Sequence, residues 1–321
     1  MTFPSLRRIV LGAAVAASAL LASCGGGNIV DPFNPTRIVA FGDGFSDVGQ
    51  TGARYTVNDG TVNVWAARFS ERYSLPLVAQ SANGTSRATG NARIQEKPDA
   101  GGSTTTLTIR EQIDAFLAAG PIQPTDLVVI NGGFSDIIAQ TVNTSLTPAQ
   151  RLANVRQAGT DLATQVRRVI TAGATHVVLV GVYDLRITPW ARSIGLGNEG
   201  SALSDLSLRF NEALQLPLVD LGRQLLYVDA ANYFNLLFNQ PRSFNFERSD
   251  LVACTATGSG DMGIGISATA HVSSRLCNPT NVQTAVAVDY NRLVFADPVY
   301  PTPAAHRLFG DFAYDRVRSI F

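Results

Sequence analysis

The sequence has few of the residues that bind metals, and it has no excess of basic charge. Its 321 residues include 3 histidines and 3 cysteines, and no histidines have the paired spacing of metal ligands. The formal net charge is zero, and it becomes −2 when Arg7 and Arg8 are set aside with the leader described below. A chain without a basic field has no electrostatic attraction for nucleic acid. We therefore expect neither a metal site nor a nucleic-acid partner.

Long apolar runs are also missing, apart from one near the N-terminus. Arg7 and Arg8 precede an apolar run of 14 residues from Ile9 to Ala22. This run is too short to span a bilayer, which takes about 20 residues. Basic residues followed by a short apolar run are typical of a secretory signal. We predict that residues 1–23 are a signal peptide.

The end of this run, Leu21-Ala22-Ser23-Cys24, resembles the lipobox of bacterial lipoproteins. The resemblance implies that Cys24 is lipidated and becomes the mature N-terminus. Residues 24–36 are rich in glycine and are expected to form a flexible tether. The expected location is the bacterial cell envelope, with the membrane as partner through the lipid anchor, and Gly25 is typical of sorting to the outer membrane. The alternative is an ordinary cleaved signal with an incidental cysteine.

Two cysteines remain if Cys24 carries lipid. Cys254 and Cys277 have 22 residues between them, and an even pair in an exported protein favours a disulfide. Such a bond stabilises the fold by roughly 3 kcal/mol through its effect on the unfolded chain. The alternative is a pair of buried thiols.

Short apolar runs alternate with helical patterns from residue 37 onward. This alternation predicts an α/β fold, with a flavodoxin-like doubly wound parallel sheet in a three-layer α/β/α arrangement over residues 37–321. Residues 241–293, rich in Ser, Thr, Gly and Asn, are expected to form a loop-dominated insertion pinned by the two cysteines. The predicted strands are RIVAF from Arg37, DLVVI from Asp126, THVVLVGV from Thr175 and LLYVD from Leu225, with LPLVA from Leu75 as a weaker fifth. The predicted helices lie in NVWAARFSERY from Asn63, IREQIDAFLAAG from Ile109 and the long segment from Thr147 to Gly173.

The motif GFSD occurs twice, at Gly44 and at Gly133, each time after a predicted strand. Both copies are therefore expected at the ligand edge of the sheet. The first copy begins like the dinucleotide motif G-x-G-x-x-G, but Asp47 replaces its third glycine and Asp43 lies within the turn. Two carboxylates beside a phosphate would repel it, so we expect no nucleotide and no other cofactor.

The first copy lies in FGDGFSDVG, which resembles the first block of the GDSL, or SGNH, hydrolases, F-G-D-S-x-S-D-x-G. ATGNARI, INGGFSDII and FADPVYPTPAAH are similar to the second, third and last blocks, in the family's order. The likeness covers most of the chain after residue 36 and is nearest to the exported lipase and phospholipase branch. It implies the SGNH hydrolase fold and a site at Gly44, Gly90, Ser135, Asp297 and Tyr300.

Three of these positions depart from the family pattern. Gly44 stands in place of the nucleophilic serine, Ser135 in place of the oxyanion asparagine, and Tyr300 in place of the catalytic histidine. A tyrosine hydroxyl, with an ordinary pKa near 10, is a poor proton acceptor at neutral pH. In serine hydrolases, loss of the nucleophile or the base costs on the order of 10⁶ in turnover.

We therefore predict a family member with a degenerate site that keeps a ligand-binding or structural role. Its pocket would hold an acyl ester or a carboxylate through backbone amides such as that of Gly90. One alternative is an active carboxylic-ester hydrolase with a non-standard catalytic arrangement. Another is an interaction module that uses only the surface of the fold.

The remaining polar residues near these motifs are expected to have structural roles. Asp43, Asp47 and Asp136 would accept hydrogen bonds from backbone amides and so shape the site. Ser46 would cap a following helix. The histidines are placed as a core residue of a strand (His176), a solvated residue of the insertion (His271) and a residue of the last helix that either satisfies a loop carbonyl or packs (His306).

Overall fold

The computed structural model describes residues 32–255, 257–258, 271–283 and 289–321. The predicted signal peptide, Cys24 and most of the predicted tether lie outside the described residues. Asn34–Phe321 form one structural unit, and the fold described below is that of this unit.

Four parallel strands form the central sheet, in the order β1-β2-β3-β4. They are β1 (Arg37–Phe41), β2 (Asp126–Asn131), β3 (His176–Val180) and β4 (Leu225–Val228). Their apolar runs are largely buried, as expected for strands covered on both faces. In the register, Val39 lies opposite Val128, and Val128 lies opposite Val177. The four main strand predictions are confirmed.

The weaker fifth strand prediction, LPLVA from Leu75, is wrong. These residues form no strand, and Pro76 has no N–H to donate to a ladder. A later segment lies beside β1 instead: Ala40 pairs with Ser86 in a parallel bridge, and Arg87 N donates to Ala40 O at 2.7 Å. This segment holds the outer position of the sheet that a second strand occupies in flavodoxin-like order.

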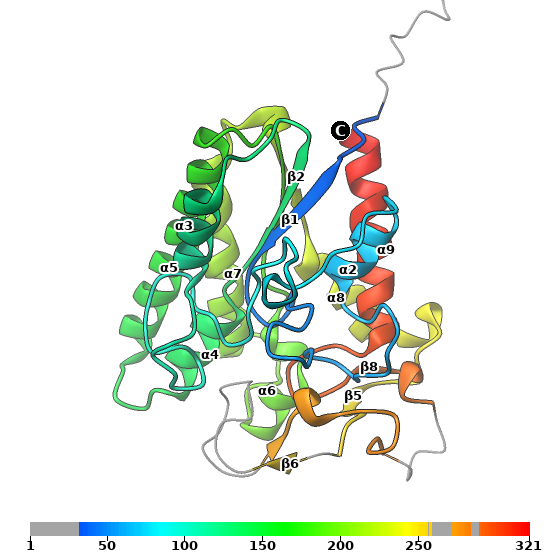
Figure 1. The fold of residues 1–321 in the computed structure, drawn as a ribbon. Helices are drawn as coiled ribbons and strands as arrows, with labels where there is room; N and C mark the ends of the chain where they lie inside the picture. The colour runs from blue at the N-terminus through cyan, green and yellow to red at the C-terminus, as the bar shows by residue number, and fades with distance from the viewer. Residues whose placement is uncertain (1–31, 256, 259–270, 284–288) are drawn as a thin grey trace, which may run out of the picture. The chain divides into compact units, whose positions relative to one another are not determined.

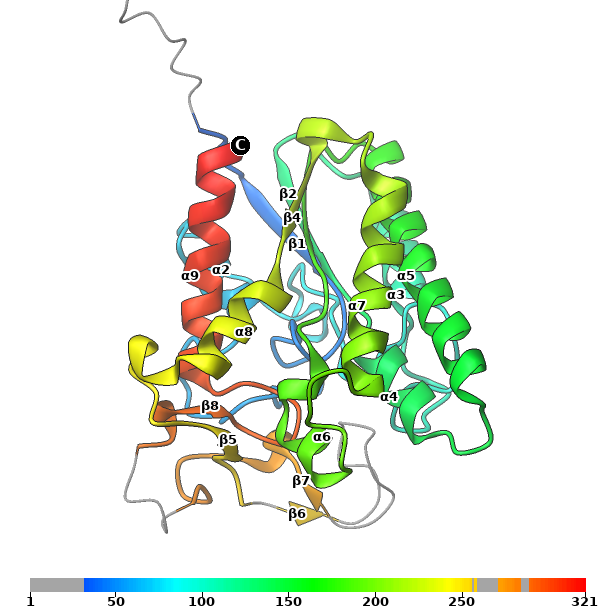
Figure 2. The ribbon, with the colours of Figure 1, turned by 180° about the vertical axis from the view of Figure 1, so that it is seen from behind.

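Helices cover both faces of the sheet, which confirms the three-layer α/β/α prediction (Figures 1 and 2). One layer contains α3 (Ile109–Ala119), α4 (Phe134–Val142), α5 (Pro148–Thr171) and α7 (Ala202–Gln215). The other contains α2 (Trp65–Glu71), α8 (Ala230–Asn239) and α9 (Pro303–Ile320). Capping boxes at Thr108 and Thr147 open α3 and α5.

The insertion lies beyond the carboxyl ends of the main strands, next to the short helix α6 (Pro189–Ser193) (Figure 1). β5 (Arg248–Val252) pairs in parallel with β8 (Leu293–Phe295), and β6 (Thr257–Gly258) pairs with β7 (His271–Val272). The disulfide between Cys254 and Cys277 is present, as predicted. In the part of the chain that is described, no helix is long and apolar enough to cross a membrane.

Candidate functional site

The two GFSD segments lie where β1 and β2 end, at the carboxyl edge of the sheet. β1 ends at Phe41 and β2 at Asn131, and Gly133 precedes the first residue of α4. The phenylalanines of the two motifs, Phe45 and Phe134, are fully buried with ring centroids 5.3 Å apart. The prediction that both copies sit at this edge is confirmed.

The surroundings of Gly44 leave no room for a side chain at this position. A Cβ built on Gly44 would lie 2.7 Å from the Tyr300 hydroxyl oxygen and 3.1 Å from Cγ of Tyr55. The backbone at Gly44 is outside the left-handed region, so it would accept a serine without strain. Neighbouring side chains, not the turn conformation, therefore exclude a side chain at this position.

Tyr300 supplies most of this obstruction. Its side chain is fully buried, and its ring packs edge-on against Tyr55 with centroids 5.1 Å apart. Burial, together with the nearby Asp43 carboxyl, raises the pKa of Tyr300 well above its ordinary value of 10. Among the described residues its hydroxyl has no hydrogen-bond partner. Tyr300 therefore stays protonated and cannot replace the base of a serine hydrolase.

The Gly90 amide is already used inside the protein. Gly90 N donates to Asp47 Oδ2 at 2.8 Å, and a Cβ on Gly90 would overlap the end of the Tyr55 ring. Asp47 also accepts from Gly49 N and Gln50 N, each at 2.8 Å. The expectation of a free amide donor at Gly90 is thus wrong, because the buried Asp47 carboxylate takes this N–H to offset its own loss of water.

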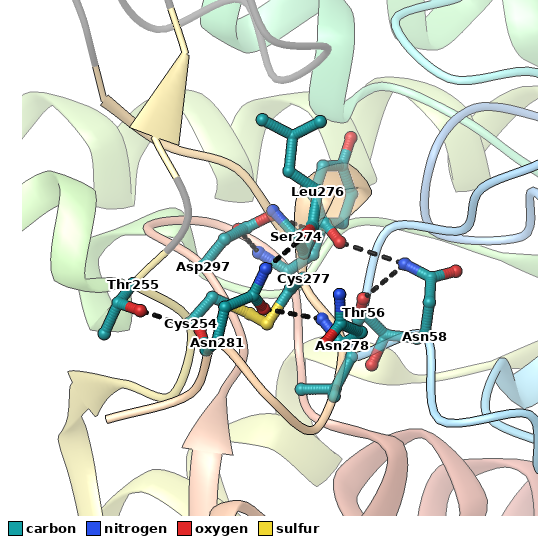
Figure 3. The surroundings of a disulfide bond; sticks show 12 residues. Thr56, Asn58, Cys254, Thr255, Ser274, Leu276, Cys277, Asn278, Asn281 and Asp297 are labelled. Atoms are coloured by element: carbon teal, nitrogen blue, oxygen red, sulfur yellow. Dashed lines mark hydrogen bonds between the residues drawn. A yellow bond between two sulfur atoms is a disulfide. The ribbon is translucent and has the colours of Figure 1, made fainter. Parts of the chain in front are cut away.

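Asp297 is held by backbone and by the insertion. It accepts from Val299 N at 2.7 Å, from Tyr300 N at 2.6 Å and from the Ser274 hydroxyl, which comes from the loop closed by the disulfide (Figure 3). Burial raises its pKa, which these hydrogen bonds partly oppose. Ser135 lies in the first turn of α4, buried, with no partner for its hydroxyl among the described residues.

The three aspartates beside the site accept backbone amides, as predicted. Asp43 Oδ1 accepts from Phe45 N at 3.1 Å and from the Asn131 side chain at 2.7 Å. Asp136 accepts from Ile94 N at 3.0 Å and pairs with Arg93 at 3.3 Å. Burial raises the pKa of each of the three carboxyls, those of Asp43, Asp47 and Asp136, to about 6. Burial disfavours the charged form of each carboxyl, and the hydrogen bonds offset only part of this desolvation free energy.

Other predicted roles have mixed outcomes. No helix begins after Ser46, which ends a turn and has no partner for its hydroxyl among the described residues, so its capping role is wrong. His306 lies in α9 and packs against Phe45, which is one of its two expected roles, and its Nδ1 accepts from Trp65 N at 3.3 Å. His176 opens β3 half-buried, so it is not a core residue. The His271 side chain lies outside the described part.

A polar hollow lies beside Gly90. It has a volume of about 280 Å³, and its walls include Asp47, Tyr55, Asp99 and Arg275. None of its lining residues is Leu, Ile, Val, Met or Phe. Arg275 belongs to the insertion and donates to the Thr51 hydroxyl at 3.3 Å, so the insertion does reach the hollow. The hollow suits a small polar group better than a long acyl chain.

The sequence pattern missed Tyr55, Ser274 and Arg275. Each acts on a partner that is distant in the chain: Tyr55 on Gly90, Ser274 on Asp297 and Arg275 at the hollow. No local motif marks them, and only the presence of glycine at both 44 and 90 signals that large side chains lie against this region. Among the described residues there is no group of three or more side chains that could hold a metal ion.

Comparisons with known proteins give one family match and more distant similarities. The family model described as GDSL-like Lipase/Acylhydrolase matches residues 38–312. A curated Pseudomonas putida protein, described as an uncharacterized protein in the trpE-trpG intergenic region, is 26% identical over 340 residues, covering 97% of this chain and 52% of the relative. The chain thus spans about half the length of that relative. A solved native aryl esterase of M. smegmatis has 17% identity and a TM-score of 0.43, covering 89% of this chain and 99% of the esterase.

Proposed function

The chain belongs to the GDSL-like lipase/acylhydrolase family, and from that premise we propose that it is a non-catalytic member whose ester-hydrolysing centre is filled by Tyr55 and Tyr300. The observation that carries this proposal is the position of the Tyr300 hydroxyl, 2.7 Å from where Cβ of residue 44 would lie. The space in which a family nucleophile would project is occupied by an aromatic hydroxyl.

Acyl transfer needs three groups that this centre does not offer together. A nucleophile must lose its proton to a base, and donors must stabilise the oxyanion that forms. Gly44 has no hydroxyl, Tyr300 is a poor base, and the Gly90 N–H is bonded to Asp47. Asp297, which in the family orients the base, is engaged by the Ser274 hydroxyl and by backbone amides.

A retained binding role has support from the polar hollow beside Gly90. Its volume of about 280 Å³ accommodates a small ligand, and the Arg275 guanidinium in its wall supplies a cation for a carboxylate or an ester carbonyl. Arg275 Nε is buried and lacks a partner among the described residues, so a ligand oxygen would satisfy it. Isothermal titration with acetate and butyrate checks this role: wild type should bind and Arg275→Ala should not. Equal behaviour of the two would reject the hollow as the binding place.

We also propose that the protein is an envelope lipoprotein anchored through Cys24. Support comes from the lipobox-like residues before Cys24 and the glycine-rich segment after it. Cys24→Ser should move the expressed protein from the membrane fraction to the soluble fraction. Unchanged membrane association of this variant would reject the lipid anchor.

Hydrolysis of p-nitrophenyl acetate and butyrate by the purified mature domain tests the loss of catalysis. The expected rate is indistinguishable from that of an Asp297→Asn variant. Saturable turnover by wild type that Asp297→Asn removes would overturn the proposal.

A reconstructed centre tests the same idea from the other direction. The variant Gly44→Ser/Ser135→Asn/Tyr300→His/Tyr55→Ala restores the family residues and removes the ring beside Gly90. We expect it to gain turnover over a matched control that keeps Gly44 and carries the other three changes. If the reconstructed variant unfolds cooperatively like wild type and hydrolyses no faster than its control, the assignment of these positions is wrong.

A further inference from the structure

The two edges of the sheet differ in what they present. All four main strands are parallel, so their amino ends share one edge and the candidate site lies at the other. The chain enters the fold at the amino edge, where the Asn34 side chain accepts from Arg318 near the end of α9 at 3.1 Å. Figures 1 and 2 show the beginning of β1 and the end of α9 at the same end of the molecule.

The length of chain between Cys24 and this entry point is small. Nine residues separate Cys24 from Asn34. A random-coil chain of this length has a root-mean-square span of about 17 Å. A domain of this size has a radius of gyration of roughly 19 Å, so its far edge is well beyond that average reach. A lipid on Cys24 would therefore keep the amino edge near the membrane.

This edge carries strongly exposed apolar side chains. Leu216 is 74% exposed and Val219 is 79% exposed, the two largest values among the exposed large hydrophobic residues described. They lie in and just after the short helix η4 (Leu216–Leu218), between α7 and β4. Arg167, near the end of α5, donates to Pro217 O and so fixes η4 near the turn that leads into β3. Exposed apolar residues in such a patch mark an interaction surface.

The end of α9 adds to the same edge. Ile320 is 47% exposed, and the ring of Phe321 packs against His176 at the start of β3 with centroids 4.9 Å apart. The nearby acids Asp220 and Asp315 are paired with Arg167 and Arg72. A mixture of apolar side chains and neutralised or cationic groups is typical of surfaces that rest on phospholipid headgroups.

We propose that the amino edge of the domain, through Leu216 and Val219, rests on the surface of the phospholipid bilayer that holds the lipid anchor. This inference depends on the proposed lipid anchor at Cys24. The bilayer contact holds the carboxyl edge, with its hollow and insertion, away from the membrane. The domain thus has a fixed orientation in which the candidate site faces the aqueous side.

A polarity-sensitive thiol dye tests the orientation on the full-length lipidated protein in vesicles of phosphatidylethanolamine and phosphatidylglycerol at a ratio of 3:1. The dye is placed on Val219→Cys, with Ile194→Cys as the matched control. Ile194 is 45% exposed and follows α6 at the opposite edge. With Cys24 lipidated and Cys254 bonded to Cys277, the introduced thiol is the one free for labelling.

The expected result is an emission shift to shorter wavelength and a loss of iodide quenching at position 219 when vesicles are present, with neither change at 194. Equal emission and quenching at the two positions, on protein that floats with the vesicles, would overturn the orientation while leaving the anchor intact. If the protein with Cys24 fails to float with the vesicles, as protein without Cys24 does, the lipid anchor itself is overturned. In a second measurement, Leu216→Ser/Val219→Ser should make the anchored protein's residues 25–33 more open to protease. An unchanged cleavage rate would contradict the contact.

Discussion

The two GFSD segments have the same four residues and similar surroundings, but their glycines are required for different reasons. Each segment follows a buried strand and buries its phenylalanine in one shared aromatic cluster. Each ends in a buried aspartate that accepts an amide from the same intervening loop: Asp47 from Gly90 and Asp136 from Ile94. The pair thus holds the 90–94 loop from both sides.

The difference lies at the first residue of each motif. Gly133 has φ of 112°, in the left-handed region, and a Cβ there would overlap the Phe210 ring. Gly44 has an ordinary backbone conformation, and Tyr300 alone comes within 3 Å of a Cβ at this position. The fold requires the second glycine, whereas the side chain of Tyr300 requires the first. Two copies of the same sequence motif can therefore require glycine for different structural reasons.

The largest expected loss of stability comes from substituting Gly133. Gly133→Ala should lower the free energy of unfolding by roughly 3–5 kcal/mol, because it combines left-handed strain with overlap of a packed ring. Gly52→Ala is the matched control, since Gly52 has φ of 86° and nothing within 4 Å of a built Cβ. The control should lose about 1–2 kcal/mol from strain alone. Urea unfolding measures both, and equal losses would refute the contribution of Phe210.

The disulfide stabilises the part of the site that contains Asp297. The loop it closes delivers Ser274 to Asp297, and no corresponding link reaches Asp136 among its described contacts. Cys254→Ser/Cys277→Ser should lower the free energy of unfolding by about 3 kcal/mol. Urea unfolding of the double variant and of reduced wild type checks this value, and the two should agree. A loss below about 0.5 kcal/mol in both would show that the loop is held without the bond.

Asp43 should make stability depend on pH in a defined direction. Burial raises its pKa from 3.8 to about 6, so its contribution to stability is present below pH 4 and is lost as the pH rises through 6. Asp43→Asn keeps an oxygen for Phe45 N and Asn131 and removes the charge. The stability of the variant minus that of wild type should therefore rise by roughly 2 kcal/mol between pH 4 and pH 7.5.

Burial lowers the pKa of His306 to about 3, so His306 makes stability increase as the pH rises, which is opposite to the effect of Asp43. This contribution is the same in the variant and in wild type, and it cancels in the difference between them. Urea unfolding at several pH values gives the difference directly. A difference that stays flat, or that falls as the pH rises, would contradict a desolvated Asp43.

The smallest effects are expected at the two serines of the motifs. Ser46 and Ser135 are both buried, and their hydroxyls have no partners among the described residues. Ser46→Ala and Ser135→Ala should each change stability by no more than about 0.5 kcal/mol, in the stabilising direction, because a buried hydroxyl without a partner contributes no hydrogen bond. Thermal unfolding of both variants measures this. A loss above 1 kcal/mol at either serine would mean that its hydroxyl bonds to a group such as buried water.

The sequence was sufficient to predict the sheet and the family. Apolar runs such as RIVAF and DLVVI form buried strands because each is short and bounded by turn residues. The strand prediction for LPLVA was wrong although its apolar residues resemble those of a buried strand. The segment that pairs with β1 is the more polar one around Ser86. Composition does not determine which of two neighbouring segments forms the backbone hydrogen bonds to β1.

The state of the site could not be predicted in the same way. The residues at 44, 135 and 300 can be compared with the family pattern from the sequence alone. The hydrogen bond from Gly90 N to Asp47 and the position of Tyr55 depend on contacts between separate segments. An amide donor in a motif is available to a ligand only if no buried acceptor in the fold claims it.

A double-mutant cycle on Gly44→Ser and Tyr300→His tests most directly whether Tyr300 has taken the space of a nucleophile. Gly44→Ser alone should lower the free energy of unfolding by roughly 1–3 kcal/mol, because its Cβ meets the Tyr300 hydroxyl. In the Tyr300→His background the same change should cost at least 1 kcal/mol less, since the shorter ring leaves that space open. Additivity of the two substitutions within about 0.5 kcal/mol would contradict the account.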